Sequence, residues 1–336
     1  MGRRVLLVLV LLLSLSVALS AAHAQSWAKQ KVRFNEVVRS LAYAPQYVAL
    51  SNGYFGDEGL EIEFRTAWGG DKSLSALLTK QDDISLLGPE VTYYAVEQGV
   101  PDPALTFAQL TQRDTTFLVA RKGQPAFTWA GLKGKTVLTV RPASTPHFVF
   151  LWVLSKHGLQ PGKDVTVTPL TPPTQAPAFI EGRGDYTAMS EPAVTQVEKM
   201  GIGTTVASIG VEGGLLAYTT FAALASYIKA HPDIIQKFTN AIHKGMQWTD
   251  AHSSKEIAQA ITAYYDGVPP EVLVTALERY RKQQTWRSDP IVSDEATNAL
   301  QDILVFNKAL KKRLPIEKVN IHGFGEKAVE TAKLKK

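Results

Sequence analysis

Four segments of the chain share a pattern that restricts the fold more than any other feature, because proline opens each segment and glycine closes it. They span residues 45–53, 89–99, 146–158 and 192–201. Proline suits the first turn of a helix, since the N–H that it lacks would have no partner there, and glycine suits the left-handed position that ends a helix. The pattern therefore predicts one helix in each segment.

Short runs of apolar and β-branched residues accompany these helices, at residues 60–64, 83–87, 136–140 and 185–189. Runs of this length and composition are typical of buried strands. Strands that alternate with helices form parallel sheets with helices on both faces. We therefore expect an α/β fold with doubly wound sheets.

Helical patterns dominate the rest of the chain, at residues 222–230, 232–251, 255–265, 270–284 and 294–310. They predict a C-terminal helical layer. Because two α/β units of similar size come first, we expect a first lobe (31–120 and 217–326) interrupted by a second lobe (121–216), with crossings at 115–122 and 215–221. The charged stretch 327–336 has few apolar residues, so we expect a basic, frayed tail.

The N-terminus carries the pattern of a secretory signal at residues 1–24. Arg3 and Arg4 precede an apolar run over residues 5–19, and Ala22-His23-Ala24 supplies the small residues of a cleavage site. A membrane anchor needs about 20 apolar residues, and this run is shorter. We therefore predict a cleaved signal peptide and a protein that reaches the periplasm without a lipid anchor.

Composition excludes several kinds of chemistry. The chain has no cysteine, so it has no disulfide, thiolate metal site, cysteine nucleophile or lipid-modified cysteine. Its 36 Lys and Arg against 31 Asp and Glu are spread along the chain, which argues against a nucleic-acid surface. No two mature histidines have the spacing of a helical metal site, and nucleophile-elbow, zinc-helix, EF-hand and Walker A motifs are absent. We expect no cofactor, no metal and no enzymatic activity.

Several motifs occur in the order of a known family. The first is Gly53-Tyr-Phe-Gly-Asp-Glu-Gly-Leu-Glu-Ile-Glu-Phe64, followed by Trp68-Gly-Gly70 and residues 83–88. Next come Gly131-Leu-Lys-Gly-Lys-Thr-Val137, residues 157–165, residues 179–186 and Glu191-Pro192. Over residues 32–244 the chain resembles the nitrate/sulfonate/taurine-type solute-binding proteins of ABC importers. The resemblance implies a two-lobed periplasmic-binding-protein fold, type II-like, that closes over a small solute and passes it to a membrane permease.

The position of the binding site follows from topology. In open α/β sheets, ligands bind at the carboxyl ends of the strands, where the next helices begin. This rule selects ligand-binding candidates from both lobes: Arg39, Ser40, Tyr43, Trp68, Gly69, Gly70, Gly88, Glu90, Arg141, Ser144, Thr145, Phe148, Ser190 and Glu191.

Most of these candidates have a structural alternative. Tyr43 would equally brace the turn before Pro45, and Trp68 would be either a cleft wall or a cap on its lobe. Arg141 would bind an anion or pair with a carboxylate across the cleft. Glu90 and Glu191 stand in first helical turns, where the helix dipole alone favours carboxylates.

Aromatic and charged candidates give different indications about the solute. Tyr43, Trp68, Tyr93, Tyr94 and Phe148 would supply stacking walls, which favours a planar heterocycle or an aromatic acid over an inorganic anion. Arginine candidates favour an anion and glutamate candidates favour an amine, so the charges leave the solute open.

Together these observations predict a monomeric solute-binding subunit of an importer, whose partners are a small molecule and an ABC permease. A secreted ligand-sensing protein that partners a receptor is the alternative. An exported enzyme is a weaker one, since related fungal pyrimidine synthases use a cysteine-rich motif that a cysteine-free chain cannot carry.

The signal sequence gives the first testable prediction. Exported protein should begin at or near Gln25, because Ala22 and Ala24 occupy the positions that specify cleavage. N-terminal sequencing of the exported chain checks this. A mature chain that keeps residues 5–19 would show that the segment is an anchor.

Overall fold

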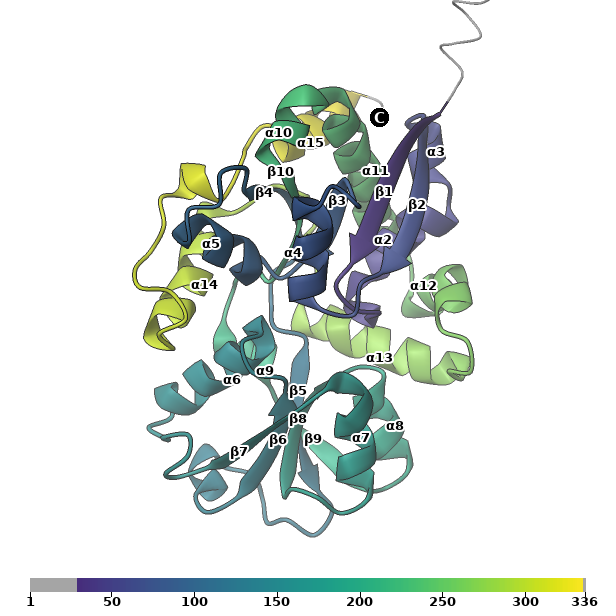
Figure 1. The fold of residues 1–336 in the computed structure, drawn as a ribbon. Coiled ribbons are helices and arrows are strands. Elements are labelled where there is room, and N and C mark those ends of the chain that lie inside the picture. Colours follow the sequence, from purple (N-terminus) through teal and green to yellow (C-terminus); the bar gives the residue numbers. More distant parts are fainter. Residues whose placement is uncertain (1–28, 335–336) are drawn as a thin grey trace, which may run out of the picture.

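Residues 29–334, which the computed structural model describes, form two five-stranded sheets surrounded by helices (Figure 1). We call the part built on the first sheet lobe 1 and the part built on the second sheet lobe 2. The predicted α/β fold of two lobes is confirmed. The predicted signal peptide at residues 1–24 lies outside the described residues.

The sheet of lobe 1 has the strand order β2-β1-β3-β10-β4. Its strands are β1 (Gln30–Glu36), β2 (Leu60–Thr66), β3 (Ile84–Leu87), β4 (Ala104–Thr111) and β10 (Thr219–Leu224). The sheet of lobe 2 has the order β7-β6-β8-β5-β9. Its strands are β5 (Thr116–Arg121), β6 (Thr136–Val140), β7 (Thr166–Leu170), β8 (Tyr186–Ser190) and β9 (Gly203–Ser208).

Both sheets are mixed, whereas the sequence predicts parallel ones. In lobe 1, β10 runs antiparallel to β3 and β4, and in lobe 2, β5 runs antiparallel to β8 and β9. These two strands are the first after each crossing between lobes. The crossing chain enters the new sheet at the edge that faces the other lobe, and the strand then runs away from that other lobe. Each of these two strands is therefore antiparallel to its neighbours.

The four helices predicted from proline and glycine are present as α2 (Ala44–Ser51), α5 (Glu90–Glu97), α6 (Thr145–Lys156) and α8 (Ala193–Lys199). Before the return crossing the chain also forms α3 (Tyr54–Asp57), α4 (Gly70–Leu78), α7 (Pro172–Ile180) and α9 (Ile209–Gly213). The C-terminal layer comprises α10 (Ala225–Ala230), α11 (Pro232–Ala251), α12 (Ser254–Ile261), α13 (Pro270–Gln283), α14 (Asp294–Phe306) and α15 (Phe324–Leu334). Short 3-10 turns lie at Leu41–Tyr43, Trp129–Leu132, Thr262–Tyr264 and Ile316–Lys318.

The lobe boundaries stay a proposal, with one shift. The sequence places residues 116–120 in lobe 1, but β5 pairs with β8 and β9, so we propose that the first crossing precedes Thr116. The return crossing leads into β10, which starts at Thr219. Helix α14 packs against both lobes, because Leu300 and Ile303 share one apolar cluster with Tyr93 of α5 and Val149 of α6.

Two predictions about the C-terminal part are wrong. Residues 222–224 belong to β10 and not to a helix. The sequence pattern is misleading here because the strand is buried throughout, and its continuous apolar run lacks the alternation that marks a half-buried strand. Residues 327–334 are helical and not frayed, because they belong to α15. Phe324 and Ala328, one turn apart, form a narrow apolar stripe within a charged sequence, and α15 packs on α11 through it.

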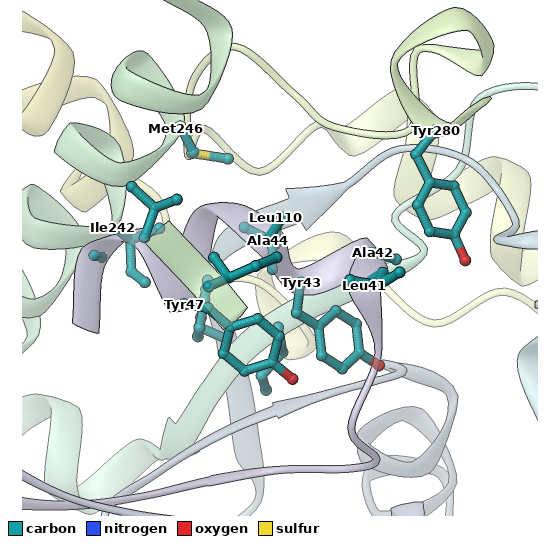
Figure 2. Close-up of a cluster of buried hydrophobic side chains, with 14 of the residues drawn as sticks. Leu41, Ala42, Tyr43, Ala44, Tyr47, Leu110, Ile242, Met246 and Tyr280 are labelled. Atoms are coloured by element: carbon teal, nitrogen blue, oxygen red, sulfur yellow. The ribbon is translucent and has the colours of Figure 1, made fainter. Parts of the chain in front are cut away.

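The core of lobe 1 lies where α2 meets α11. Figure 2 shows Tyr47 of α2, Ile242 and Met246 of α11 and Leu110 of β4, which belong to one buried apolar cluster. The two helices approach closely at Gly245, where an added Cβ atom would clash with the Pro45 carbonyl oxygen and lie 2.9 Å from the Ala49 Cβ atom.

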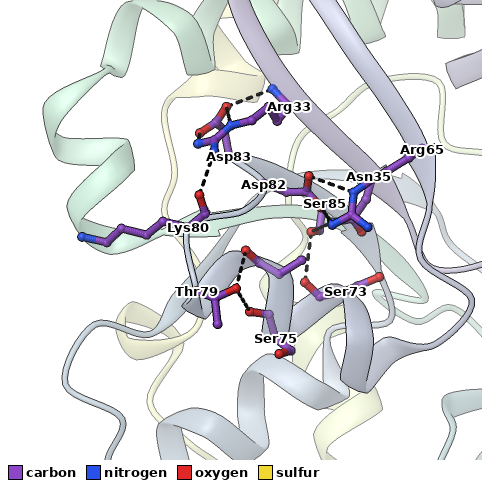
Figure 3. Close-up of polar contacts among 11 residues, drawn as sticks. Arg33, Asn35, Arg65, Ser73, Ser75, Thr79, Lys80, Asp82, Asp83 and Ser85 are labelled. Carbon is purple, nitrogen blue, oxygen red and sulfur yellow. Dashed lines mark hydrogen bonds and ion pairs between the residues drawn. The ribbon is translucent and has the colours of Figure 1, made fainter.

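A polar network links the residues that precede β3 to β1 and β2 (Figure 3). The Arg33 side chain binds both carboxylate oxygens of Asp83, at 3.1 and 2.5 Å. Asp82 accepts hydrogen bonds from Asn35 of β1 and Arg65 of β2, each at 2.5 Å. Asp82 and Asp83 precede β3, so this network holds three adjacent strands in register. Among residues 29–334, no helix is long and apolar enough to cross a membrane.

The α2–α11 contact gives a stability prediction. Gly245→Ala should lower the Tm by roughly 2 to 8 °C, because the new methyl group must push the two helices apart. Thermal unfolding followed by circular dichroism measures the shift. Gly56→Ala in α3 is the matched control, since only the flexible end of Lys29 lies near its added Cβ atom. Equal shifts in the two variants would contradict the close approach.

Candidate ligand-binding site

A cavity of about 480 Å³ lies between the two lobes. Lobe 1 contributes the loops that follow β1, β2 and β3, and lobe 2 contributes those that follow β6, β7 and β8. The crossings contribute Thr115, Tyr218 and Thr219. The cavity therefore lies at the carboxyl ends of the strands, where the topology rule places a ligand.

Twelve of the fourteen predicted site residues line this cavity. They are Arg39, Ser40, Tyr43, Trp68, Gly69, Gly88, Glu90, Arg141, Ser144, Thr145, Ser190 and Glu191. Gly70 and Phe148 do not line it. Gly70 is buried at the start of α4, and the Phe148 side chain turns from α6 into the apolar cluster that α6 shares with α5 and α14. Tyr93 and Tyr94, the other expected stacking walls, pack against that same cluster.

One whole segment of the wall lies outside the predicted site. Thr171, Pro173, Gln175 and Ala176 follow β7 and begin α7. They obey the same strand-end rule, and the Thr-Pro-Pro-Thr run at 171–174 is a signal for a helix start. Thr115 and Tyr218 were missed for another reason, because they lie in crossings and not in strand-to-helix loops.

Arg39 is held by the protein itself. It donates to Glu36 at 2.8 Å and to Thr66 at 3.0 Å, and its guanidinium lies 5.6 Å from the Tyr47 ring centroid. Burial raises the pKa of Glu36, although hydrogen bonds from Tyr47 and Thr66 and the charge of Arg39 oppose this. A buried carboxyl group thus stands directly beside the Arg39 charge.

Trp68 stands at the rim of the cavity in an unusual conformation. Its φ is +60°, in the left-handed region that large side chains rarely occupy, and its side chain is 61% exposed. An indole with so much exposed area does not cap its lobe by packing. Strained backbone of this kind gathers at functional sites.

Arg141 pairs with a carboxylate across the cleft, as one of its two predicted roles requires. It donates to Asp71 at 3.3 Å, and this contact joins lobe 2 to the first turn of α4 in lobe 1. Burial acts to raise the pKa of Asp71, but hydrogen bonds from Arg141 and the backbone lower it overall. The pair is exposed, so it is worth about 1 kcal/mol or less.

The two glutamates of the cavity differ in their partners. Glu191 forms an ion pair with Arg279 of α13 at 2.7 Å and accepts the Thr195 N–H at 3.0 Å. Its negative charge is therefore stabilised by a cation and by the start of helix α8. Glu90 accepts the Thr145 hydroxyl at 2.6 Å, and no ion pair of it with Lys or Arg is found among residues 29–334. Burial raises the pKa of both carboxyl groups against these hydrogen bonds.

Another buried carboxyl group, that of Asp114, lies at the first crossing. Asp114 accepts the Thr116 N–H at 2.7 Å, and Gln283 of α13 donates to its backbone carbonyl, also at 2.7 Å. Burial raises the pKa of Asp114 to about 7, although hydrogen bonds from Thr116 and Tyr218 oppose this. Among the described residues no cluster of histidine and carboxylate side chains could hold a metal ion.

Two α/β lobes that meet at a cavity lined by their strand ends are the architecture of the periplasmic-binding-protein fold. The chain belongs to the NMT1/THI5-like family, whose model matches residues 41–255. A Bacillus subtilis (strain 168) protein, YtlA, whose name describes it as a binding protein, is 43% identical over 296 residues. The match covers 88% of this chain and 89% of YtlA.

Solved structures share the fold at low identity. The alkanesulfonate-binding protein SsuA from Xanthomonas axonopodis pv. citri, bound to MOPS, is 20% identical with a TM-score of 0.70 over 87% of this chain and 98% of SsuA. The periplasmic nitrate-binding protein NrtA from Synechocystis PCC 6803 is 16% identical with a TM-score of 0.71 over 91% of this chain and 90% of NrtA. The desulfurization enzyme DszB shares the fold at 14% identity and a TM-score of 0.65, over 90% of this chain and all of DszB. The resemblance to sulfonate- and nitrate-binding proteins is thereby confirmed.

Asp114 gives a pH prediction. Because its folded-state pKa of about 7 exceeds the ordinary value of 3.8, the unfolded carboxyl group loses its proton first and stability falls as the pH rises from about 4 to 7. Asp114→Asn should therefore raise the Tm at pH 8 more than at pH 5. Thermal unfolding at both pH values measures this, with Asp266→Asn on an exposed turn as the control. The same gain at both pH values would contradict the pKa assignment.

Proposed function

We propose that this protein captures a small organic solute between its two lobes and delivers it to the permease of an ABC importer. The observation that carries the proposal is the cavity between the lobes, to which both lobes contribute strand-end loops. A solute in that position contacts both lobes at once, so it stabilises the state in which they are together. A permease could then distinguish loaded protein from empty protein by the relative position of the lobes.

The walls of the cavity support a planar solute with apolar faces. Trp68 and Tyr43 stand on the lobe 1 side, and Pro173, Ala176 and Met189 stand on the lobe 2 side. Sites for small molecules commonly combine such apolar walls with a few polar groups that fix orientation. The volume of about 480 Å³ falls within the range of such sites.

Membership of a family with named binding proteins supports binding over catalysis. The structural likeness to DszB shows that the fold also serves an enzyme, and a cysteine-to-serine mutant of DszB has been crystallised with biphenyl-2-sulfinic acid. This chain has no cysteine, so chemistry that depends on a cysteine is closed to it. We propose a non-enzymatic role for a monomeric protein that is exported to the periplasm through its N-terminal signal sequence.

Solute that remains bound through native purification provides the test. Mass spectrometry should detect a small planar compound that is released on denaturation. Trp68→Ala should then weaken the calorimetric affinity for that compound by about fivefold, because stacking on the indole is worth about 1 kcal/mol. The stability of the ligand-free protein should change little, since most of the indole is exposed.

A second tryptophan supplies the matched control for this experiment. Trp152 of α6 does not line the cavity and packs edge-on against Phe306, with ring centroids 5.0 Å apart. Trp152→Ala should lower the Tm and leave the affinity unchanged. Equal affinity in Trp68→Ala and the unaltered protein would remove the indole from the site. Failure of the unaltered, exported protein to bind any recovered compound would contradict solute capture itself.

A further inference from the structure

We propose that Glu90 determines which solutes this cavity accepts: its carboxyl group fills the place where an anionic group would otherwise bind. The solute therefore presents a hydrogen-bond donor to this point, such as an amino group on a planar heterocycle, and not a sulfonate or an inorganic anion. This inference rests on the proposed function, because it concerns the chemistry of the solute in the same cavity.

Two helix starts converge at this point. Glu90 is the first residue of α5 in lobe 1, and Thr145 is the first residue of α6 in lobe 2. Both line the cavity, and these helices have 8 and 12 residues. The free N–H groups at a helix start attract anions, so two such starts on opposite walls would form a strong anion site.

The protein supplies its own acceptor there. The Glu90 carboxyl group accepts the Thr145 hydroxyl at 2.6 Å, a contact that joins the two lobes. The backbone N–H groups of Glu90 and Thr145 act to lower the pKa of this carboxyl group, although its burial raises the pKa overall. The place that an anionic solute would take between the two helix starts is therefore filled by the carboxyl group of a residue that is only 5% exposed.

Gly88 makes this arrangement possible. A Cβ atom at this position would clash with a carboxylate oxygen of Glu90, so only glycine leaves room for the side chain to fold back over the loop. Gly88 also lines the cavity, and the Gly-Pro-Glu sequence at 88–90 thus places the carboxyl group at the helix start.

The other charged side chains of the cavity already have partners within the protein, so Glu90 determines the charge of the solute that the cavity accepts. Arg39 is engaged by Glu36, and Glu191 is engaged by Arg279. Arg141 has an exposed partner in Asp71, and its charge stabilises ionised Glu90 without forming an ion pair with it. Removal of the Glu90 carboxyl group would leave both helix starts and Arg141 available to an anion.

The test is a gain of anion binding in Glu90→Ala. The probes are MOPS and sodium sulfate, titrated calorimetrically into the unaltered protein and the variant after any bound solute has been removed by reversible denaturation. Glu90→Ala should bind one or both probes at least tenfold more tightly than the unaltered protein. Thermal unfolding confirms that the variant is folded.

Glu97→Ala is the matched control, because it removes the same charge from the same helix outside the cavity. It should gain no affinity for either probe. If Glu90→Ala does not fold, Glu90→Gln decides the question, since it removes the charge and keeps the volume, and its affinity for the probes should still rise.

Three results would overturn the proposal: tight binding of the probes by the unaltered protein, equal gains in Glu97→Ala and Glu90→Ala, or no gain in the folded Glu90 variants. None of these depends on the native solute. Failure of solute capture would be seen separately, as the absence of any recovered compound that binds the unaltered protein.

Discussion

The position of the chain crossings determines most of this structure. The chain passes between lobes where the carboxyl ends of the parallel strands lie, which forces β5 and β10 to run against their neighbours. The parallel strands of each sheet then end on the side that faces the other lobe, and the loops after β1, β2, β3, β6, β7 and β8 meet there. The cavity between the lobes is therefore a consequence of connectivity, and its individual side chains determine only what it accepts.

Local chemistry explains how much of this the sequence could predict. Proline fixes φ at a helix start, and glycine readily adopts the left-handed conformation at a helix end, so these residues alone are enough to locate α2, α5, α6 and α8. The strand-end rule then locates most of the cavity wall. It fails for Phe148 because a helix presents side chains in all directions, and only packing decides that this ring enters the apolar cluster that α6 shares with α5 and α14. It also gives no position for β10, whose buried apolar run suits a strand or a helix equally.

The pairing of charges could be predicted only in part, because the sequence offered a carboxylate across the cleft as one of two roles for Arg141 and did not identify Asp71. Arg39 and Arg141 are both arginines at strand ends, yet one is enclosed by Glu36, Thr66 and aromatic rings while the other bridges an open cleft to Asp71. Glu36 lies three residues from Arg39 in the sequence, so their pairing is local. Thr66, which also binds Glu36, lies thirty residues away from it in the sequence, and only the fold brings the two together. Charge counts along a chain thus say little about the charge that a ligand meets.

Helix α13 of the C-terminal layer contacts lobe 2 and the first crossing through hydrogen bonds. Tyr280 binds the Thr115 carbonyl and the Glu191 N–H, at 3.2 and 3.1 Å, and Gln283 accepts a hydrogen bond from Ser208 at 2.6 Å. On the side of α4, by contrast, the exposed pair of Asp71 and Arg141 joins the lobes. Rotation of lobe 2 about the α13 contacts would keep the hydrogen bonds of Tyr280 and Gln283, and it would break the weak pair together with the Glu90–Thr145 hydrogen bond between the lobes. The lobes would then separate on one side, and a solute would enter and leave past Trp68.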